Sequence, residues 1–193
     1  MTKIVTILPE GFADWETTLL NGVAKGFYKA ETTYATVDAM PVVSIGGLHV
    51  TPDLAIADIN AATADALLIC GGTGWKQPGA PDISEIARRF HEARKVVAAI
   101  CDGTFALAKT GLLDSVAHTS NGVGYLDETG YRGKPHYRDV PQAVSDRHII
   151  TASATAPVSF MAEVMRELGF ADDQLNYYIG LHAAQFSAIQ RAA

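Results

Sequence analysis

The chain has 193 residues, of which 48% are hydrophobic and 19% charged, and its formal net charge is −6 at pH 7. This composition predicts an ordered globular protein that folds as a single domain over residues 1–193. Because 15 Lys and Arg stand against 21 Asp and Glu without a basic stripe, no nucleic-acid or anionic-membrane partner is expected.

The sequence shows neither a membrane span nor a secretory signal. Its apolar runs are shorter than the ~18 residues that a span needs, and residues 1–8 lack the long apolar region of a signal peptide. We therefore expect the protein in the cytoplasm. In that compartment its two cysteines, Cys70 and Cys101, are expected to be free thiols.

The first hundred residues alternate strand-like and helix-like segments. The predicted strands are apolar runs bounded by polar residues or turn residues, at 3–8, 33–38, 66–69 and 96–100. The predicted helices cover 13–28 and 83–91, and a hairpin with arms at 42–45 and 48–50 brackets two glycines. This alternation indicates a mostly parallel sheet with helices on both faces, a doubly wound three-layer α/β sandwich.

The pattern weakens in the second half of the chain. Candidate strands lie at 116–119, 143–144 and 149–151. Pro157 suits the first turn of a helix whose apolar face carries Phe160, Met161, Val164, Met165 and Leu168. A last helix is predicted over roughly 171–190.

Cys101 stands between the strand at 96–100 and a short helix that begins near Thr104 and ends at Gly111. A strand that turns directly into a helix exposes the turn residue at the carboxyl edge of the sheet, and Gly103 supplies the missing Cβ that such a turn needs. The thiol would then face the amino end of the helix, where a thiolate is favoured. The alternative is that Cys101 is one more small buried residue.

Glu16 continues an apolar helical stripe backward into the predicted helix at 13–28. The stripe consists of Leu19, Leu20, Val23 and Phe27. A carboxyl group on the inward face must find donors or raise its pKa and keep its proton, and a protonated Glu16 could donate to a thiolate. The alternatives are that Glu16 is a first-turn acid with no further role, or that Asp14 is the acid.

The segment CGGTGW, residues 70–75, directly follows the strand at 66–69. Glycines there allow backbone N–H groups to approach a ligand, as an oxyanion hole requires, although a tight turn would also explain them. Gly71, Thr73 and Trp75 are further candidates for substrate binding. Trp15 and Trp75 are candidate pocket walls, with a place in the core as the alternative.

Four segments together resemble the ThiJ/PfpI superfamily, which is similar in fold to class I glutamine amidotransferases. They are ADWETTLL at 13–20, ALLICGGTGW at 66–75, VAAICDGTFALAKTGLL at 97–113 and ITASATAPVSF at 150–160. The resemblance implies a flavodoxin-like sandwich, usually homodimeric, with Cys101 as nucleophile and Glu16 as its protonated partner. It also implies that the N–H groups of Gly72 and Asp102 stabilise an oxyanion.

The chain departs from that family in two places. Members with protease-like or glyoxalase-like activity usually have His directly after the cysteine, whereas this chain has Asp102. The downstream His-x-Glu pair of true amidotransferases is also missing, so glutaminase activity is not expected. His118, in VAHTSN, follows Cys101 at about the spacing at which some members supply a histidine, and is a candidate partner for the thiol.

These observations predict an enzyme in which Cys101 attacks a small electrophilic carbon of a carbonyl, amide or isonitrile, as a hydrolase, hydratase or glyoxalase-like enzyme. No cofactor is expected, and no metal site is expected either, because no pair of histidines shows ligand spacing on one element. Two alternatives stay open. One is a redox or stress protein whose thiol is oxidised without housekeeping catalysis, and the other is an interaction subunit that lacks the chemistry.

Overall fold

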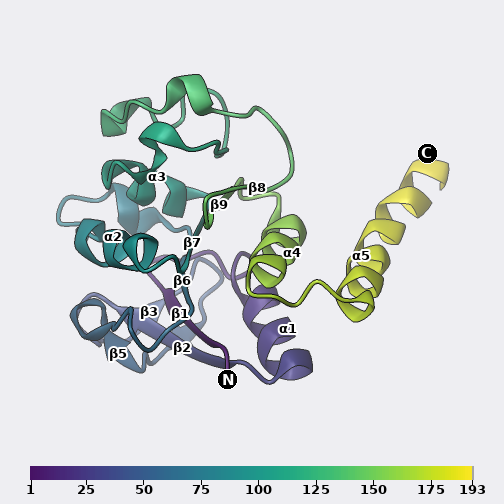
Figure 1. Ribbon diagram of the computed structural model, residues 1–193, viewed down its shortest axis with the longest axis horizontal. Coiled ribbons are helices and arrows are strands. Elements are labelled where there is room, and N and C mark those ends of the chain that lie inside the picture. The colour runs from purple at the N-terminus through teal and green to yellow at the C-terminus, as the bar shows by residue number, and fades with distance from the viewer. Residues whose placement is uncertain (193) are drawn as a thin grey trace.

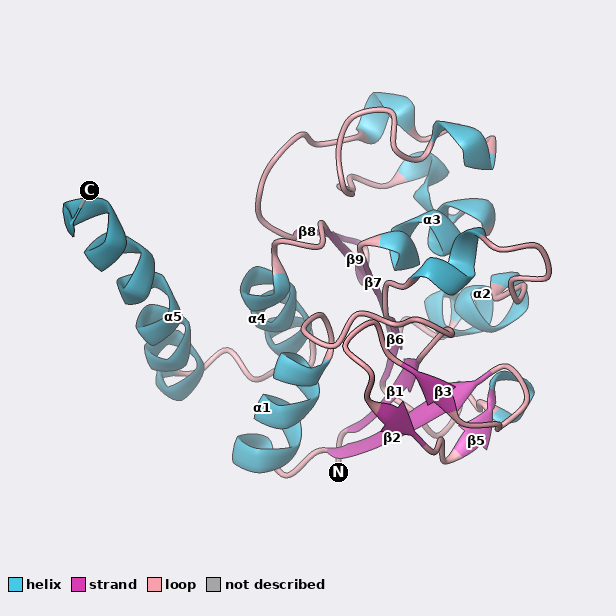
Figure 2. Ribbon diagram, turned by 180° about the vertical axis from the view of Figure 1, so that it is seen from behind, coloured by secondary structure: helices cyan, strands magenta, loops and turns pink. Residues whose placement is uncertain are grey.

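The computed structural model describes residues 1–192, and the side chains of residues 1–185. Within this part of the chain a seven-stranded sheet lies between two helical layers, as predicted (Figures 1 and 2). The strand order is β5-β2-β1-β6-β7-β9-β8, and only the β8–β9 pair is antiparallel. The strands are β1 (Lys3–Ile7), β2 (Glu31–Thr36), β5 (Leu54–Ala55), β6 (Ala66–Ile69), β7 (Val96–Ile100), β8 (Val144–Asp146) and β9 (Ile149–Ala152).

The helices cover the two faces of the sheet in pairs (Figure 2). One face is packed by α1 (Thr18–Tyr28) and α4 (Pro157–Glu167), and the other by α2 (Ser84–Glu92) and α3 (Asp102–Lys109). Every residue of β6 and β7 is buried, which explains why these two strands have continuous apolar sequences. The predicted hairpin is present as β3 (Val42–Val43) paired with β4 (His49–Val50).

The helix predicted over 13–28 begins later than expected, at Thr18. The preceding backbone is bound to its neighbours: Phe12 forms a bridge with Gly72, and Ala13 N–H donates to the carbonyl of Gly71 at 3.1 Å. Residues 14–17 therefore form turns, and Glu16 is not a helical residue. Its inward position comes from this turn rather than from helical periodicity.

The strand predicted at 116–119 is wrong. Its amides bond side chains of the neighbouring sheet instead of a strand backbone, Ala117 N–H donating to Asp146 and Thr119 N–H to Thr151, each at 2.8 Å. A single bridge between His118 and Tyr137 is the β-type pairing that remains. Side-chain acceptors thus take the place of the strand-to-strand hydrogen bonds that the apolar pattern of residues 116–119 predicted.

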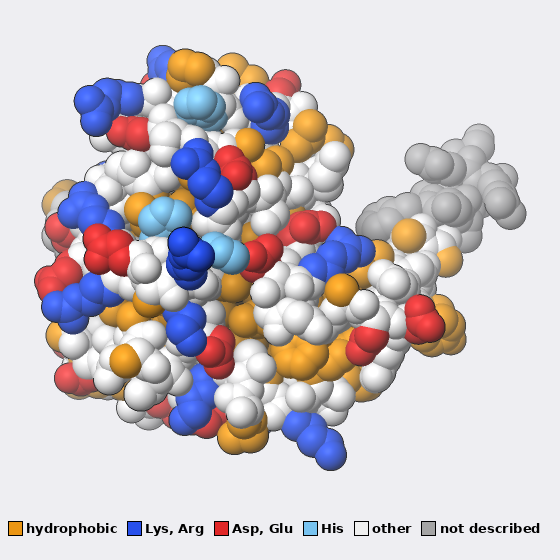
Figure 3. All heavy atoms as spheres, viewed as in Figure 1, with side chains coloured by type: hydrophobic (Ala, Val, Ile, Leu, Met, Phe, Trp, Pro, Cys, Tyr) orange, Lys and Arg blue, Asp and Glu red, His pale blue; other side chains and the backbone are white. Residues whose placement is uncertain are grey.

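Helix α5 (Asp173–Ala192) extends away from the sandwich, as Figure 1 shows. Near its start Leu175 is buried against the layer of α1 and α4, whereas Tyr177 and Leu181 are exposed. In the described residues, no helix has both the length and the apolar character needed to cross a bilayer. On the face drawn in Figure 3, basic and acidic side chains are interspersed.

The parallel register brings the ends of three strands to one edge of the sheet. Ile7 of β1 pairs with Ile69 of β6, and Ile69 pairs with Ala99 of β7. The segments after these strands, which hold Glu16, Cys70 and Cys101, therefore meet beyond the carboxyl edge. This is the edge at which sheets of this kind bind ligands.

Candidate active site

Cys101 occupies a strained turn between β7 and α3. Its φ is +55° and its ψ −128°, a conformation that a non-glycine residue adopts only when its surroundings enforce it. Cys101 N–H donates to Ala152 on β9 at 3.0 Å, and Thr104 N–H donates to the Cys101 carbonyl at 3.0 Å. A Cβ on Gly103 would stand 2.3 Å from the Ile69 carbonyl oxygen, so the predicted need for glycine there is confirmed.

Glu16 is fully buried beside this turn. Gly71 N–H donates to Glu16 Oε2 at 2.7 Å, and the Cys70 sulfur lies 3.9 Å from the same oxygen. The other oxygen, Oε1, has no hydrogen-bond partner in the described part of the chain. A Cβ on Gly71 would stand 2.4 Å from Glu16 Oε2 and 2.6 Å from Cys101 Cβ. The carboxyl group and the thiol are thus packed against the same glycine.

Asp14, the alternative acid, has a different environment. Its carboxylate accepts hydrogen bonds from the Ser44 hydroxyl and from Gly46 N–H, the latter at 2.8 Å. The bond from Ser44 lowers the Asp14 pKa. Asp14 therefore stays ionised at neutral pH, which leaves Glu16 as the acid that can carry a proton near the thiol.

Glu16 and Cys101 titrate as a pair. Burial raises the pKa of Glu16 to about 7, against the opposing effect of the neighbouring Cys101 thiol. Burial and the Glu16 carboxylate raise the pKa of Cys101 to about 12. The first direction agrees with the sequence prediction, whereas the second is opposite to the expected thiolate, because desolvation outweighs the helix end. Between these values the pair holds one proton.

The raised pKa of Glu16 makes stability depend on pH. The folded chain holds this proton up to about pH 7, whereas the unfolded chain releases it near 4.5. The stabilisation is therefore complete below pH 4.5 and is lost as the pH rises through 7, a decrease in unfolding free energy of about 3 kcal/mol. Urea unfolding of wild type and Glu16→Gln at pH 4.5 and 8 measures it. Equal pH dependence in both proteins would contradict the assignment.

The predicted oxyanion donors differ in their availability. Gly71 N–H already bonds Glu16, and Thr73 N–H donates to the Gly11 carbonyl at 3.2 Å. Gly72 N–H has no acceptor among the described residues, and Asp102 N–H opens α3, where no carbonyl within the helix can accept it. Of this predicted set, Gly72 and Asp102 are therefore the backbone N–H groups without an acceptor in the described part of the chain.

The two tryptophans lie in different environments. Trp75 is buried in the core, and its indole N–H donates to the Cys70 carbonyl at 2.7 Å, so it supports the glycine segment and does not face a ligand. Trp15 is half-exposed, and its indole N–H donates to the Ala154 carbonyl at 3.1 Å. Because Ala154 N–H donates to Asn121 Oδ1, Trp15 is linked through Ala154 to the residue that contacts the thiol.

His118 does not act on the thiol in this structure. It is fully buried, its Nδ1 lies 2.8 Å from the Val116 carbonyl, and its Nε2 lies 3.4 Å from the Tyr131 hydroxyl. The rings of Tyr131 and Tyr137 pack edge-on against it, and burial lowers its pKa. His118 is a structural residue of this aromatic cluster, which corrects the sequence prediction.

Asn121 is the residue that the sequence reading missed. Its side-chain amide donates to Cys101 Sγ at 3.3 Å, and its Oδ1 accepts Ala154 N–H at 2.9 Å. A donor at the sulfur favours the thiolate, so the bond from Asn121 opposes the effects of burial and of Glu16 that raise the Cys101 pKa. The segment after the helix was the right place to look for a thiol partner, but the partner stands three residues beyond His118.

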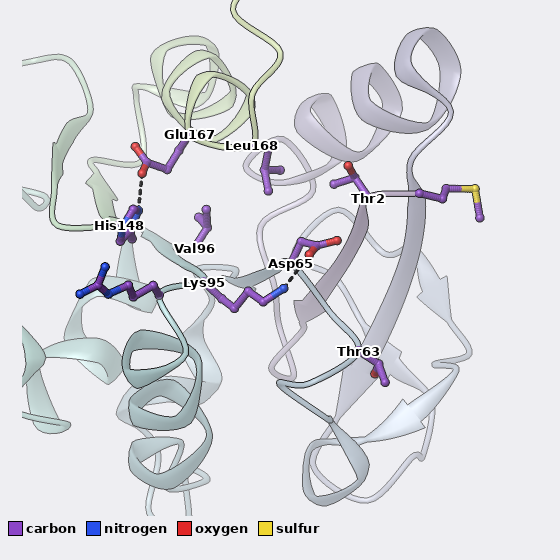
Figure 4. A pocket seen from close by; sticks show the side chains of 10 residues that line it. Thr2, Thr63, Asp65, Lys95, Val96, His148, Glu167 and Leu168 are labelled. Carbon is purple, nitrogen blue, oxygen red and sulfur yellow. Dashed lines mark hydrogen bonds and ion pairs between the residues drawn. The ribbon is translucent and has the colours of Figure 1, made fainter.

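Elsewhere in the part of the chain that the structure describes, no second cluster of this kind is present. A cavity of about 570 Å³ lies at the amino-terminal ends of the strands, the opposite edge of the sheet from Cys101 (Figure 4). Lys95 pairs with Asp65 there at 2.8 Å, His148 contacts Glu167, and Arg94 also lines the cavity. Among the described residues, no group of three or more His, Cys, Asp or Glu side chains is arranged to hold a metal ion.

Comparisons with known proteins agree with this geometry. The model of the DJ-1/PfpI family matches residues 2–167. The crystal structure of Atu0886, a DJ-1 superfamily protein from Agrobacterium tumefaciens, is 40% identical with a TM-score of 0.91, and the match covers 96% of this chain and 100% of that one.

Several relatives of this chain have names that refer to an activity. The uncharacterised protease YoaZ of Bacillus subtilis is 34% identical over 151 residues, 75% of this chain and 70% of the relative. The glutathione-independent glyoxalase DJR-1.2 of Caenorhabditis elegans is 26% identical over 140 residues, 72% of this chain and 73% of the relative. The names differ, so similarity alone does not select a reaction.

Proposed function

Because the chain belongs to the DJ-1/PfpI family, we propose that it is an enzyme whose Cys101 thiol attacks a small electrophilic carbon of a carbonyl, amide or isonitrile. The observation that carries this proposal is the meeting of Cys101, Glu16 and Asn121 at the carboxyl edge of the sheet. Cys101 is only partly exposed, which favours a small substrate.

The raised pKa of Cys101 determines how the attack begins. Little thiolate exists beforehand, so the proton leaves the sulfur as the carbon–sulfur bond forms. Glu16, with a pKa of about 7, receives that proton, and Asn121 stabilises the sulfur by donating to it. The N–H groups of Gly72 and Asp102 bind the negative charge that develops on the substrate.

The second half of the reaction reverses the proton's path. With an amide, Glu16 returns its proton to the amine that leaves the adduct, and water then hydrolyses the thioester and leaves a proton on the Cys101 sulfur. A carbonyl or an isonitrile has no leaving group, so its adduct itself takes the proton from Glu16, and water or a substrate oxygen then displaces the sulfur, which regains a proton. No step uses His118, because both of its ring nitrogens face other groups. We propose this cysteine chemistry for a hydrolase, hydratase or glyoxalase-like enzyme, with all of residues 1–193 acting as one domain.

The redox alternative has less support. A peroxide sensor needs a thiol that is substantially ionised near neutral pH, whereas burial raises the Cys101 pKa to about 12. Catalysis through Glu16 needs no standing thiolate. The experiment is a turnover screen of small aldehydes, amides and isonitriles, comparing wild type with a Cys101 variant and weighing the intact protein for a covalent adduct. Turnover that survives loss of the thiol would disprove the proposal.

We also propose that the protein is a cytoplasmic homodimer. A groove between α1 and α5 supports the dimer: it exposes apolar side chains, among them Phe27, Tyr177 and Leu181. Sedimentation velocity at micromolar concentration measures the oligomeric state directly, and a monomer at all concentrations would disprove this part of the proposal.

A further inference from the structure

Asp102, the residue directly after the nucleophile, has an unusual set of partners. Its Oδ1 accepts a hydrogen bond from the Tyr125 hydroxyl and lies 3.9 Å from Lys76 Nζ. Lys76 Nζ also lies 4.0 Å from the centroid of the Tyr125 ring and 5.0 Å from that of Phe105. The Asp102 side chain is only 18% exposed, so this is a partly buried cluster beside the thiol.

A carboxylate at this position opposes the chemistry proposed above. The negative charge of Asp102 contributes to the raised pKa values of both Glu16 and Cys101. The other groups that face Cys101 are Glu16 itself, the buried Cys70 and the neutral amide of Asn121. Within the cluster, Lys76 is therefore the group that can compensate the Asp102 charge.

The hydrogen bond from Tyr125 to Asp102 also fixes the segment that carries Asn121. Tyr125 and Asn121 are the two ends of a short segment in which Gly122 and Gly124 have φ values of +154° and +83° and Val123 is exposed. Asn121 contacts the Cys101 sulfur, and Tyr125 contacts Asp102. The two polar contacts hold this glycine-containing segment over the turn at Cys101.

We propose that Lys76 and Tyr125 are positioning residues for Cys101: both bind the Asp102 carboxylate, Lys76 compensates its charge, and Tyr125 keeps Asn121 on the sulfur. This inference rests on the proposed function, since it concerns the same nucleophile. The consequence is that Cys101, although followed by an acid, stays reactive only while Lys76 and Tyr125 both bind that acid.

The test is the rate at which iodoacetamide, a neutral reagent, alkylates Cys101 between pH 6 and 10, followed by peptide mass mapping. Lys76→Met keeps the stem against the rings but removes the charge, and should slow alkylation at pH 8 by about three- to tenfold. Asp102→Asn should accelerate it by a similar factor. In the Asp102→Asn background, Lys76→Met should have no effect, because no carboxylate remains to compensate.

Two further variants complete the design. Lys109→Met is the matched control, because Lys109 Nζ lies 4.7 Å from the centroid of the same Phe105 ring but makes no ion pair with Asp102; its alkylation rate should equal that of wild type. Tyr125→Phe should slow alkylation even in the Asp102→Asn background, because Asn121 loses its tether in both. Thermal melting checks that each variant is folded.

The inference is overturned if Lys76→Met alkylates like wild type, or if it slows alkylation equally with and without the Asp102 carboxylate. Alkylation requires no turnover, so the two proposals fail separately. Turnover that survives replacement of Cys101 would refute the enzyme proposal and leave the alkylation result intact. If all variants are alkylated at the wild-type rate while turnover depends strictly on Cys101, only the role of Lys76 and Tyr125 is refuted.

Discussion

Replacing Cys101 with serine is expected to lower the turnover of every accepted substrate by at least ~10³-fold. The hydroxyl is nearly isosteric, so the strained turn and the contact with Asn121 should persist. A serine hydroxyl holds its proton far more tightly than a thiol does, however, and Glu16, with a pKa of about 7, is too weak a base to remove it.

The measurement is kcat/KM for the best substrate found in the screen, with circular dichroism and thermal melting to show that the variant is folded. Intact-mass analysis of a quenched reaction should show an adduct on wild type and none on Cys101→Ser. Cys70 serves as an internal control, because it is buried with a raised pKa and should remain unmodified in both proteins. An unchanged rate in the serine variant would refute the mechanism.

The elbow at Cys101 was predictable because the elements on both sides of it carry strong local signals. Strand β7 is apolar throughout, as a strand buried on both faces is. Gly103 stands where the end of β6 comes so close that a Cβ at this position would collide with the Ile69 carbonyl. The parallel arrangement then brings Cys70 and Cys101 to one edge. The fold and the position of Cys101 at the edge of the sheet could therefore be predicted from the sequence.

Glu16 was placed near the thiol for a reason that proved wrong. The apolar stripe of α1 pointed to an inward carboxyl group, but the helix begins only at Thr18, and a turn bound to Gly71 buries the carboxyl instead. Helical spacing and the turn happen to give the same direction. The sequence could not reveal the turn, because the bridge from Phe12 to Gly72 joins segments that are distant in the chain.

Asn121 could not be found from the sequence because its segment has no periodicity. Loop residues are positioned by contacts with the scaffold, here Ala154 after β9 and Asp102 at the start of α3. Because no periodicity aligns this segment with Cys101, His118 was predicted as the thiol partner on its residue type, which is common in catalytic sites. The raised pKa of Cys101 was missed for a related reason, since desolvation depends on how the surrounding loops cover the thiol.

Replacing Glu16 with glutamine is expected to lower kcat by about 10²–10⁴-fold, because the amide keeps the shape of the side chain but cannot take the thiol proton. In wild type, kcat/KM should rise as the pH increases through about 7. Over that range the Glu16–Cys101 pair loses its first proton, and the remaining proton can move from sulfur to carboxylate during attack. In Glu16→Gln this inflection should vanish.

Asp14→Asn is the matched control for this experiment, because it neutralises a nearby carboxylate whose partners are Ser44 and Gly46 and not the thiol. Its rate and its inflection near pH 7 should match those of wild type. If the inflection survives Glu16→Gln and disappears in Asp14→Asn, the acid that takes the proton is Asp14, and our assignment of Glu16 is wrong. If it survives in both, proton transfer does not involve either carboxylate, and the thiol must be activated by the substrate itself.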